Sequence, residues 1–123
     1  MSQREIAIAH FKAGCNCAQA VLLAFHEEVA LDETTALRLA APFGGGFGRQ
    51  REVCGAVSGG LMGLGQKYGD ENNRKCGKSQ EFLRAFKAEF GCLLCREILE
   101  KHQKKLCPAL INFAANYLED ELK

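Results

Sequence analysis

The fold predicted for this chain depends on one stretch, CGAVSGGLMGLGQKY, which runs from Cys54 to Tyr68. It does not alternate apolar and polar residues, and Gly69 follows it as a stop signal, so we expect a helix. Gly55, Gly59 and Gly63 recur every four residues, and each interior glycine destabilises a helix by about 0.5–1 kcal/mol relative to alanine. Such a bare face needs the close approach of another backbone or of a cofactor. Helix packing is the plainer of the two explanations.

The rest of the chain also has helical spacing of its apolar residues. We expect further helices over residues 3–13, 17–29, 33–41, 79–90, 93–103 and 108–122, with Asn16, Asp32, Ser79 and Cys107 as the caps of four of them. A glycine-rich loop, Phe43 to Arg51, precedes the central helix, and a polar loop is expected over residues 70–75. We therefore predict an all-α fold over residues 1–123, a compact single-domain bundle of about six helices.

Composition limits the classes of function. The chain is 47% hydrophobic, which supports a buried core, and its formal net charge of +1 gives no reason to expect nucleic-acid binding. Because the sequence has neither a secretory signal nor a long apolar run, we expect a cytoplasmic protein without membrane insertion. Seven cysteines in such a compartment indicate metal or redox chemistry more than structural disulfides.

Four of the cysteines stand where helices are expected to begin: Cys17, Cys54, Cys95 and Cys107. A helix N-terminus carries about half a positive charge, which favours thiolate over thiol. Thiolates bind metals, attack disulfides and exchange electrons. We therefore interpret these four as the redox-active thiols and as the candidate metal ligands.

The sharpest local motif is Cys54 with the bare helix that follows it. Arg49 and Arg51 lie just upstream, and their charges are expected to lower the pKa of Cys54 further. Gly55, Gly59 and Arg49 are the candidate residues for contact with a cofactor, if one approaches this face.

A second arrangement competes for some of the same residues. Cys92, Cys95, His102 and Cys107 form C-x2-C-x6-H-x4-C, which has the ligand types of a tetrahedral zinc site. The residues between them are expected to be helical rather than knuckle-like, which places zinc behind the other interpretations. Cys15 is expected to be a small apolar core residue or a surface thiol.

The order of these motifs resembles the redox-active protein family named for its C-G-A-x-x-G motif, the C_GCAxxG_C_C family. The motifs that carry the resemblance are NCAQAV from Asn16, FGGGFG from Phe43, VCGAVSG from Val53, CREIL from Cys95, and Cys107. The resemblance covers nearly the whole chain. It implies a small all-helical protein with four characteristic cysteines, matching Cys17, Cys54, Cys95 and Cys107, and a redox role for which an iron–sulfur centre is one candidate. Cys15, Cys76 and Cys92 lie outside that pattern.

Three functions follow from these observations. The first is electron transfer through a [2Fe–2S] cluster held by the four cysteines, with a redox partner protein as donor or acceptor. The second is thiol–disulfide chemistry without a metal, pairing Cys54 with Cys17 or with Cys95. The third is a structural zinc module. The residues leave open whether the chain is an enzyme, and the glycine-rich loop and bare helix face are suited to a homodimer.

Overall fold

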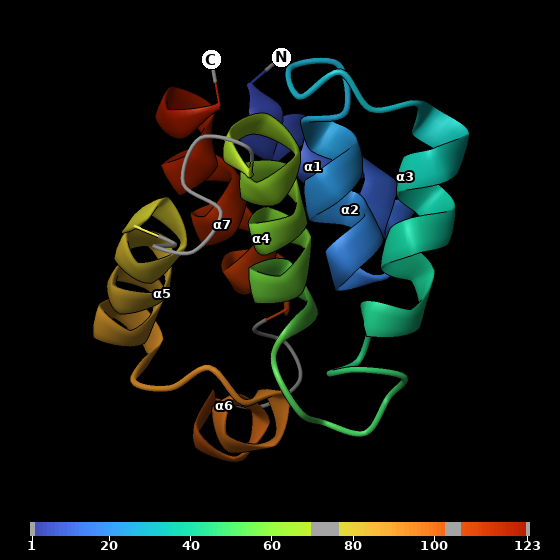
Figure 1. Cartoon of the computed structure of the whole chain (residues 1–123). Helices are drawn as coiled ribbons and strands as arrows, with labels where there is room; N and C mark the ends of the chain where they lie inside the picture. The colour runs from blue at the N-terminus through green and yellow to red at the C-terminus, as the bar shows by residue number, and fades with distance from the viewer. Residues whose placement is uncertain (1, 70–76, 103–106, 123) are drawn as a thin grey trace.

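The structure, a computed structural model, describes residues 2–69, 77–102 and 107–122, and of His102 only the backbone. Within these ranges the chain forms seven α-helices and one 3-10 helix, and no strand. They are α1 (Gln3–Lys12), α2 (Cys17–Ala24), α3 (Glu33–Ala40), the 3-10 helix η1 (Ala41–Phe43), α4 (Gly55–Tyr68), α5 (Gly77–Phe90), α6 (Cys95–His102) and α7 (Cys107–Glu121). The predicted all-α fold is confirmed (Figure 1).

Two of the predicted caps form as expected. The side chain of Asn16 accepts a hydrogen bond from the Gln19 amide at 2.8 Å, and that of Asp32 accepts one from the Thr35 amide at 3.0 Å. Each bond satisfies one of the amides that the first turn of a helix leaves without a partner. Pro42 lies in η1, where the regular helix has already ended.

Several predicted helix boundaries are wrong. The helix expected to reach Val29 ends at Ala24, because the chain then forms turns that include a left-handed residue, Ala30, with φ of 56°. Phe25 and Val29 are still buried, as the apolar spacing predicted. Helix α5 begins at Gly77, so Ser79 lies in its first turn and is not its cap. The loop expected over residues 70–75 lies outside the described residues.

The helices run up and down, so several of them begin at the same end of the molecule. In Figure 1 the glycine-rich loop and α6 lie at the lower end, and α2, α4 and α7 start there and run upward. Both termini lie at the opposite end. All four helices that begin with, or directly after, a predicted redox cysteine therefore have their N-termini at one end of the bundle.

The bare face of α4 is filled by neighbouring helices. A methyl group on Gly55 would lie 2.9 Å from the Cβ of Cys17, and one on Gly59 would overlap the carbonyl oxygen of Ala18. On another side of α4, a methyl group on Gly60 would lie 2.7 Å from the ring of Phe82. The glycines thus let α2 approach the α4 backbone directly, which is the packing explanation of the repeat.

Aromatic side chains fill the space between α5 and α7. Phe82 and Phe86 are fully buried, and the Phe86 ring lies 5.9 Å from that of Phe113, measured between centroids, in an edge-to-face arrangement. The ring centroids of Phe82 and Tyr117 lie 5.4 Å apart. These rings belong to the hydrophobic core, and α5 is held to the bundle through them.

Candidate thiol site

The starts of α4 and α6 are joined to each other. The segments that precede them run antiparallel through one bridge, between Val53 and Leu94. On either side of it, the amides of Cys54 and Cys95 donate to carbonyl oxygens of the opposite segment at 2.9 and 2.6 Å. This bridge uses Leu94, which explains why α6 begins at Cys95 and not at residue 93 as predicted. It also places two of the predicted cysteines beside each other.

The other two cysteines join them at the same end. The Cβ of Cys17 lies against Gly55, the first residue of α4. Charges on Cys107, Cys54 and Cys95 would each raise the pKa of the Cys17 thiol, so all three are within electrostatic reach of it. The structure thus brings together the four thiols that the sequence singled out, and all four are free.

Within this cluster, the Cys17 and Cys107 thiols act on each other. The interaction between them is the main reason that the pKa of Cys107 falls to about 6 and that the pKa of Cys17 rises. Burial opposes ionisation of Cys107, while the Arg51 charge and the residue's own backbone amide favour it. Of these two sulfurs, Cys107 is therefore the one on which the negative charge is favoured.

The prediction of a lowered pKa for Cys54 is wrong. Its thiol is 2% exposed, and burial raises its pKa to about 12. The backbone amides of Ala56 and Val57 act in the opposite direction, as a helix start should, but they make no hydrogen bond of ordinary cap geometry. Desolvation of a charged sulfur therefore outweighs the partial charge of the helix N-terminus.

Of the two upstream arginines, Arg51 is the one at the thiols. Its Nη1 lies 3.7 Å from the Sγ of Cys95, whereas Arg49 is an exposed residue whose side-chain carbons lie against Gly45. The sequence indicated Arg49 for a cofactor site and gave Arg51 no separate role. The backbone is left-handed at residues 45–49 and at 51, and at the two arginines this conformation has no clear signature in the sequence.

A metal or cluster needs ligands that face one centre. Four thiols are the right donor type for zinc or for a [2Fe–2S] cluster. Across residues 2–69, 77–102 and 107–122, however, no three side chains of His, Cys, Asp or Glu are arranged to hold a metal ion. The donor chemistry fits such a group and the arrangement of the sulfurs does not.

The other two cysteines that the structure describes, Cys92 and Cys15, lie outside this cluster of four thiols. Cys92 belongs to the hydrophobic core, is 7% exposed, and donates to the carbonyl oxygen of Phe90 at 3.9 Å. Burial is also the main reason that its pKa is raised. Cys15 is half-buried beside the core. The zinc set that included Cys92 also needs His102, whose side chain lies outside the described residues, as does all of Cys76.

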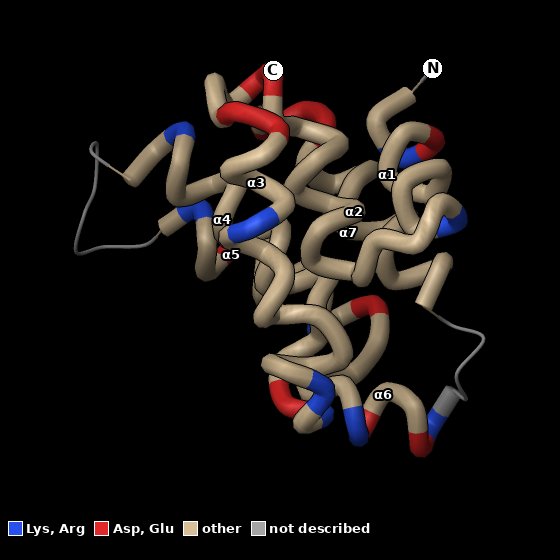
Figure 2. Tube along the Cα trace, turned by 90° about the vertical axis from the view of Figure 1, so that its right-hand side faces the viewer, with Lys and Arg blue, Asp and Glu red and all other residues tan. Residues whose placement is uncertain are grey.

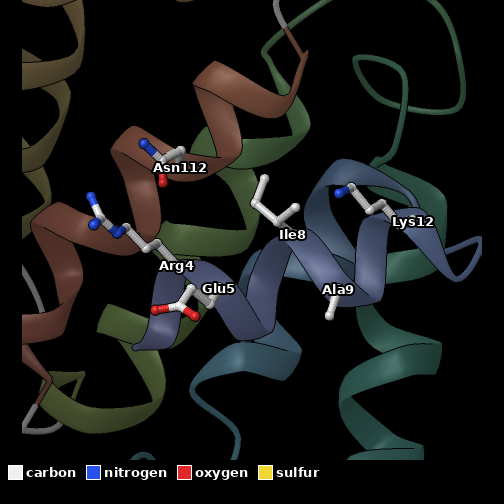
Figure 3. Close-up of a pocket in the computed structure, with 6 residues that line it drawn as sticks. All are labelled: Arg4, Glu5, Ile8, Ala9, Lys12 and Asn112. Carbon is white, nitrogen blue, oxygen red and sulfur yellow. The ribbon is translucent and has the colours of Figure 1, made fainter. Parts of the chain in front are cut away.

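Two hollows in the surface of the described residues are of a size that could take a small ligand, and neither is lined by the clustered thiols. An apolar one of about 420 Å³ adjoins Cys54 through its neighbours Val53 and Val57, but neither Cys54 nor Cys107 lines it. Another, of about 350 Å³, lies on the side of the molecule formed by α1 and α7 (Figure 3) and is lined by Arg4, Glu5, Ile8, Ala9, Lys12 and Asn112. Because Glu5 caps its own helix with Ser2, its carboxylate is already in use there.

Charges near the site are of both signs. Helix α6 carries basic and acidic residues next to each other (Figure 2), among them Arg96 and Glu97. Arg96 forms an ion pair with Glu52, with 3.6 Å between Nη1 and Oε1. In the part of the chain that the structure describes, no helix is both long and apolar enough to cross a membrane.

Residues 15–121 match the family model described as "Putative redox-active protein (C_GCAxxG_C_C)". This small helical thiol protein belongs to that family, which confirms the resemblance read from the motifs. Comparisons with curated proteins and with solved structures gave no match.

Proposed function

We propose that the chain is a thiol–disulfide redox protein whose working pair is Cys17 and Cys107. The observation that carries this proposal is that the two thiols lie near enough to shift each other's pKa, which lowers that of Cys107 to about 6 and so favours its thiolate at neutral pH. A thiolate is the attacking species in disulfide exchange, and the best attacking thiol has a pKa near the ambient pH. The pair differs from those expected from sequence, which combined Cys54 with Cys17 or with Cys95.

The reaction proceeds in two exchanges. The Cys107 thiolate attacks one sulfur of a substrate disulfide, the substrate S–S bond breaks, and one substrate thiolate leaves and takes up a proton. Cys17 then gives up its proton and attacks the Cys107 sulfur, which releases the second substrate thiol. Two protein thiols are oxidised to one disulfide, and one substrate disulfide is reduced to two thiols.

The test is to oxidise the protein with a limiting amount of disulfide and to map the protein disulfides by mass spectrometry of peptides. We expect the Cys17–Cys107 bond to form first. Cys107→Ser and Cys17→Ser should each abolish it, whereas Cys15→Ser, on a thiol outside the pair, should not. A first-formed bond that joins any other two cysteines would reject this pair.

The second candidate is electron transfer through a [2Fe–2S] cluster, and what favours it is the gathering of four thiols at one end of the bundle. Cys17, Cys54, Cys95 and Cys107 would hold the cluster, which would supply a one-electron couple. It ranks second because the described side chains do not face one centre. A structural zinc site, with no redox role, ranks behind both for the same reason.

The measurement that separates these candidates uses protein purified without air and, in parallel, after an attempt at cluster loading. Its visible absorption spectrum is recorded, and iron, sulfide and zinc are determined on the same sample. Iron with matching sulfide and a brown colour would favour the cluster, and loss of that spectrum in Cys54→Ser would assign a ligand. Bound zinc with unfolding on chelation would favour the zinc module. Colourless protein without metal is the result expected for the dithiol.

A further inference from the structure

We propose that Arg51 makes this site selective for small disulfides that carry an anionic group. The proposal rests on the dithiol function above and names its class of substrate. It concerns a residue that the family motifs do not contain and that sequence analysis did not separate from Arg49.

The position of the Arg51 guanidinium is the first observation. Its Nη1 lies 3.7 Å from Cys95 Sγ, and its positive charge also acts on Cys107. Arg51 therefore contacts one of the four thiols and is near enough to a second to act on it by charge, while the residue as a whole is exposed to solvent. A guanidinium has five N–H donors, and one sulfur contact leaves most of them available to a carboxylate.

The backbone holds Arg51 in place from both sides. The Arg51 amide donates to the carbonyl oxygen of Gly45 at 3.1 Å, and its carbonyl accepts from the Arg96 amide at 3.1 Å. Its φ is 61°, in the left-handed region that a residue with a long side chain rarely adopts. Such strain persists only where the surroundings impose it, and it is concentrated at functional sites. Here it aims the guanidinium at the thiols.

Neighbouring charges do not cancel that of Arg51. Glu52 is paired with Arg96, so these two residues offset each other. Arg49 is also exposed, two residues earlier on the same loop, and has the same backbone conformation, with φ of 63°. Arg51 therefore keeps its positive charge beside Cys95.

In this arrangement a substrate carboxylate pairs with the Arg51 guanidinium while its disulfide lies at Cys107. The chemistry is the exchange given above: the Cys107 thiolate attacks, the substrate S–S bond breaks, and Cys17 completes the protein disulfide. Arg51 forms no covalent bond. It raises the local concentration and fixes the orientation of an anionic disulfide, and it does not do so for a neutral one.

The experiment compares dithiodipropionate, which carries two carboxylates, with its uncharged bis-amide. The loss of the free Cys107 thiol is followed by quenching with an alkylating agent and quantifying the Cys107 peptide by mass spectrometry. The quantity of interest is the ratio of the two rates, anionic over neutral, because intrinsic differences between the reagents cancel when variants are compared. Arg49→Gln is the matched control, since it removes the same charge from the same backbone conformation.

We expect Arg51→Gln to lower this ratio about tenfold at low ionic strength, Arg51→Lys to keep most of it, and Arg49→Gln to change it by no more than about twofold. An equal loss for both reagents in Arg51→Gln would overturn the proposal, because Arg51 would then act on the thiol and not on the substrate. An equal fall in the ratio for Arg49→Gln would also overturn it, in favour of the general charge of the loop.

Failure of this proposal can be told apart from failure of the dithiol function. If Cys17–Cys107 is the first disulfide formed but the ratio of the anionic to the neutral rate is the same in Arg51→Gln as in the unchanged protein, only the substrate class is wrong. If both reagents react first at a cysteine other than Cys107, the working pair itself is wrong.

Discussion

Cys17 and Cys107 are chemically identical residues at the starts of two helices, yet their pKa values move in opposite directions. The difference arises because the interaction between the two thiols favours negative charge on only one sulfur. The Arg51 charge and the Cys107 amide favour that charge on Cys107. At the scale of single residues, the surroundings of each thiol therefore determine which of the two is the more acidic.

We predict that alkylation of Cys107 by iodoacetamide rises with pH through a midpoint near pH 6, because its lowered pKa leaves it ionised above about 6. Cys17→Ala removes the group that lowers this pKa most and should move the midpoint upward, toward the ordinary thiol value of 9.0. Cys17→Ser keeps a polar group that can donate a hydrogen bond and should move it much less. Site-resolved rates from peptide mass spectrometry give both midpoints. An unchanged midpoint in Cys17→Ala would mean that Cys17 is not the cause of the lowered pKa.

At the scale of elements, α2 packs directly against the backbone of α4. Gly59 allows it, since any side chain there would meet the carbonyl of Ala18. The same contact brings Cys17, at the start of α2, against Gly55 at the start of α4. The glycine face of α4 therefore allows the start of α2 to lie next to the start of α4.

Gly59→Ala is predicted to lower the free energy of unfolding by about 2–3 kcal/mol, because the added methyl forces the two backbones apart. Gly65→Ala is the matched control in the same helix. Its new methyl would have no atom within 4 Å, so we expect stabilisation by about 0.5–1 kcal/mol from helix propensity. Urea unfolding of the reduced proteins measures both changes. Equal destabilisation by the two variants would contradict the packing role of the bare face.

The loop before α4 offers a separate prediction. Arg49 is exposed and has a φ of 63°. This left-handed conformation destabilises the fold, and no contact between Arg49 and the four clustered thiols offsets it. We expect Arg49→Gly to raise the free energy of unfolding by about 1 kcal/mol, since glycine adopts this conformation without strain. Thermal or urea unfolding would show it. A loss of stability would indicate that the Arg49 side chain makes a necessary contact.

At the scale of the whole molecule, the up-and-down path of the chain decides the chemistry. Residues far apart in sequence, such as Cys17 and Cys107, meet because α2, α4 and α7 all begin at the end where α6 lies (Figure 1). The termini lie at the other end, away from the thiols. The reacting end of the bundle is thus built from four helix starts and one glycine-rich loop.

A disulfide between Cys17 and Cys107 would close a loop that spans most of the chain. We therefore predict that the oxidised protein is more stable than the reduced protein by about 4 kcal/mol, chiefly because the unfolded chain is constrained. Urea unfolding with and without reductant measures this difference. Cys107→Ser should show no such difference under the same conditions. A gain that persists in that variant would come from another cysteine pair.

Much of this molecule follows from local sequence. Helical spacing and caps such as Asn16 predict the all-α fold, because they depend on residues three or four apart. The glycine repeat predicts close packing of the central helix, because only a bare face needs it. The four helix-start cysteines are identified for the same local reason. The single-domain organisation stays a prediction from chain length.

The tertiary structure decided the rest. Cys54 and Cys107 look alike in sequence, but the first is buried and the second meets Cys17, so only Cys107 has a lowered pKa. Arg49 and Arg51 look alike as well, and left-handed backbone in the glycine-rich loop directs only Arg51 to a thiol. Burial, and contacts between residues distant in the chain, depend on how the helices pack. Local sequence therefore singled out four thiols, and packing brought them together and decided which of them has a lowered pKa.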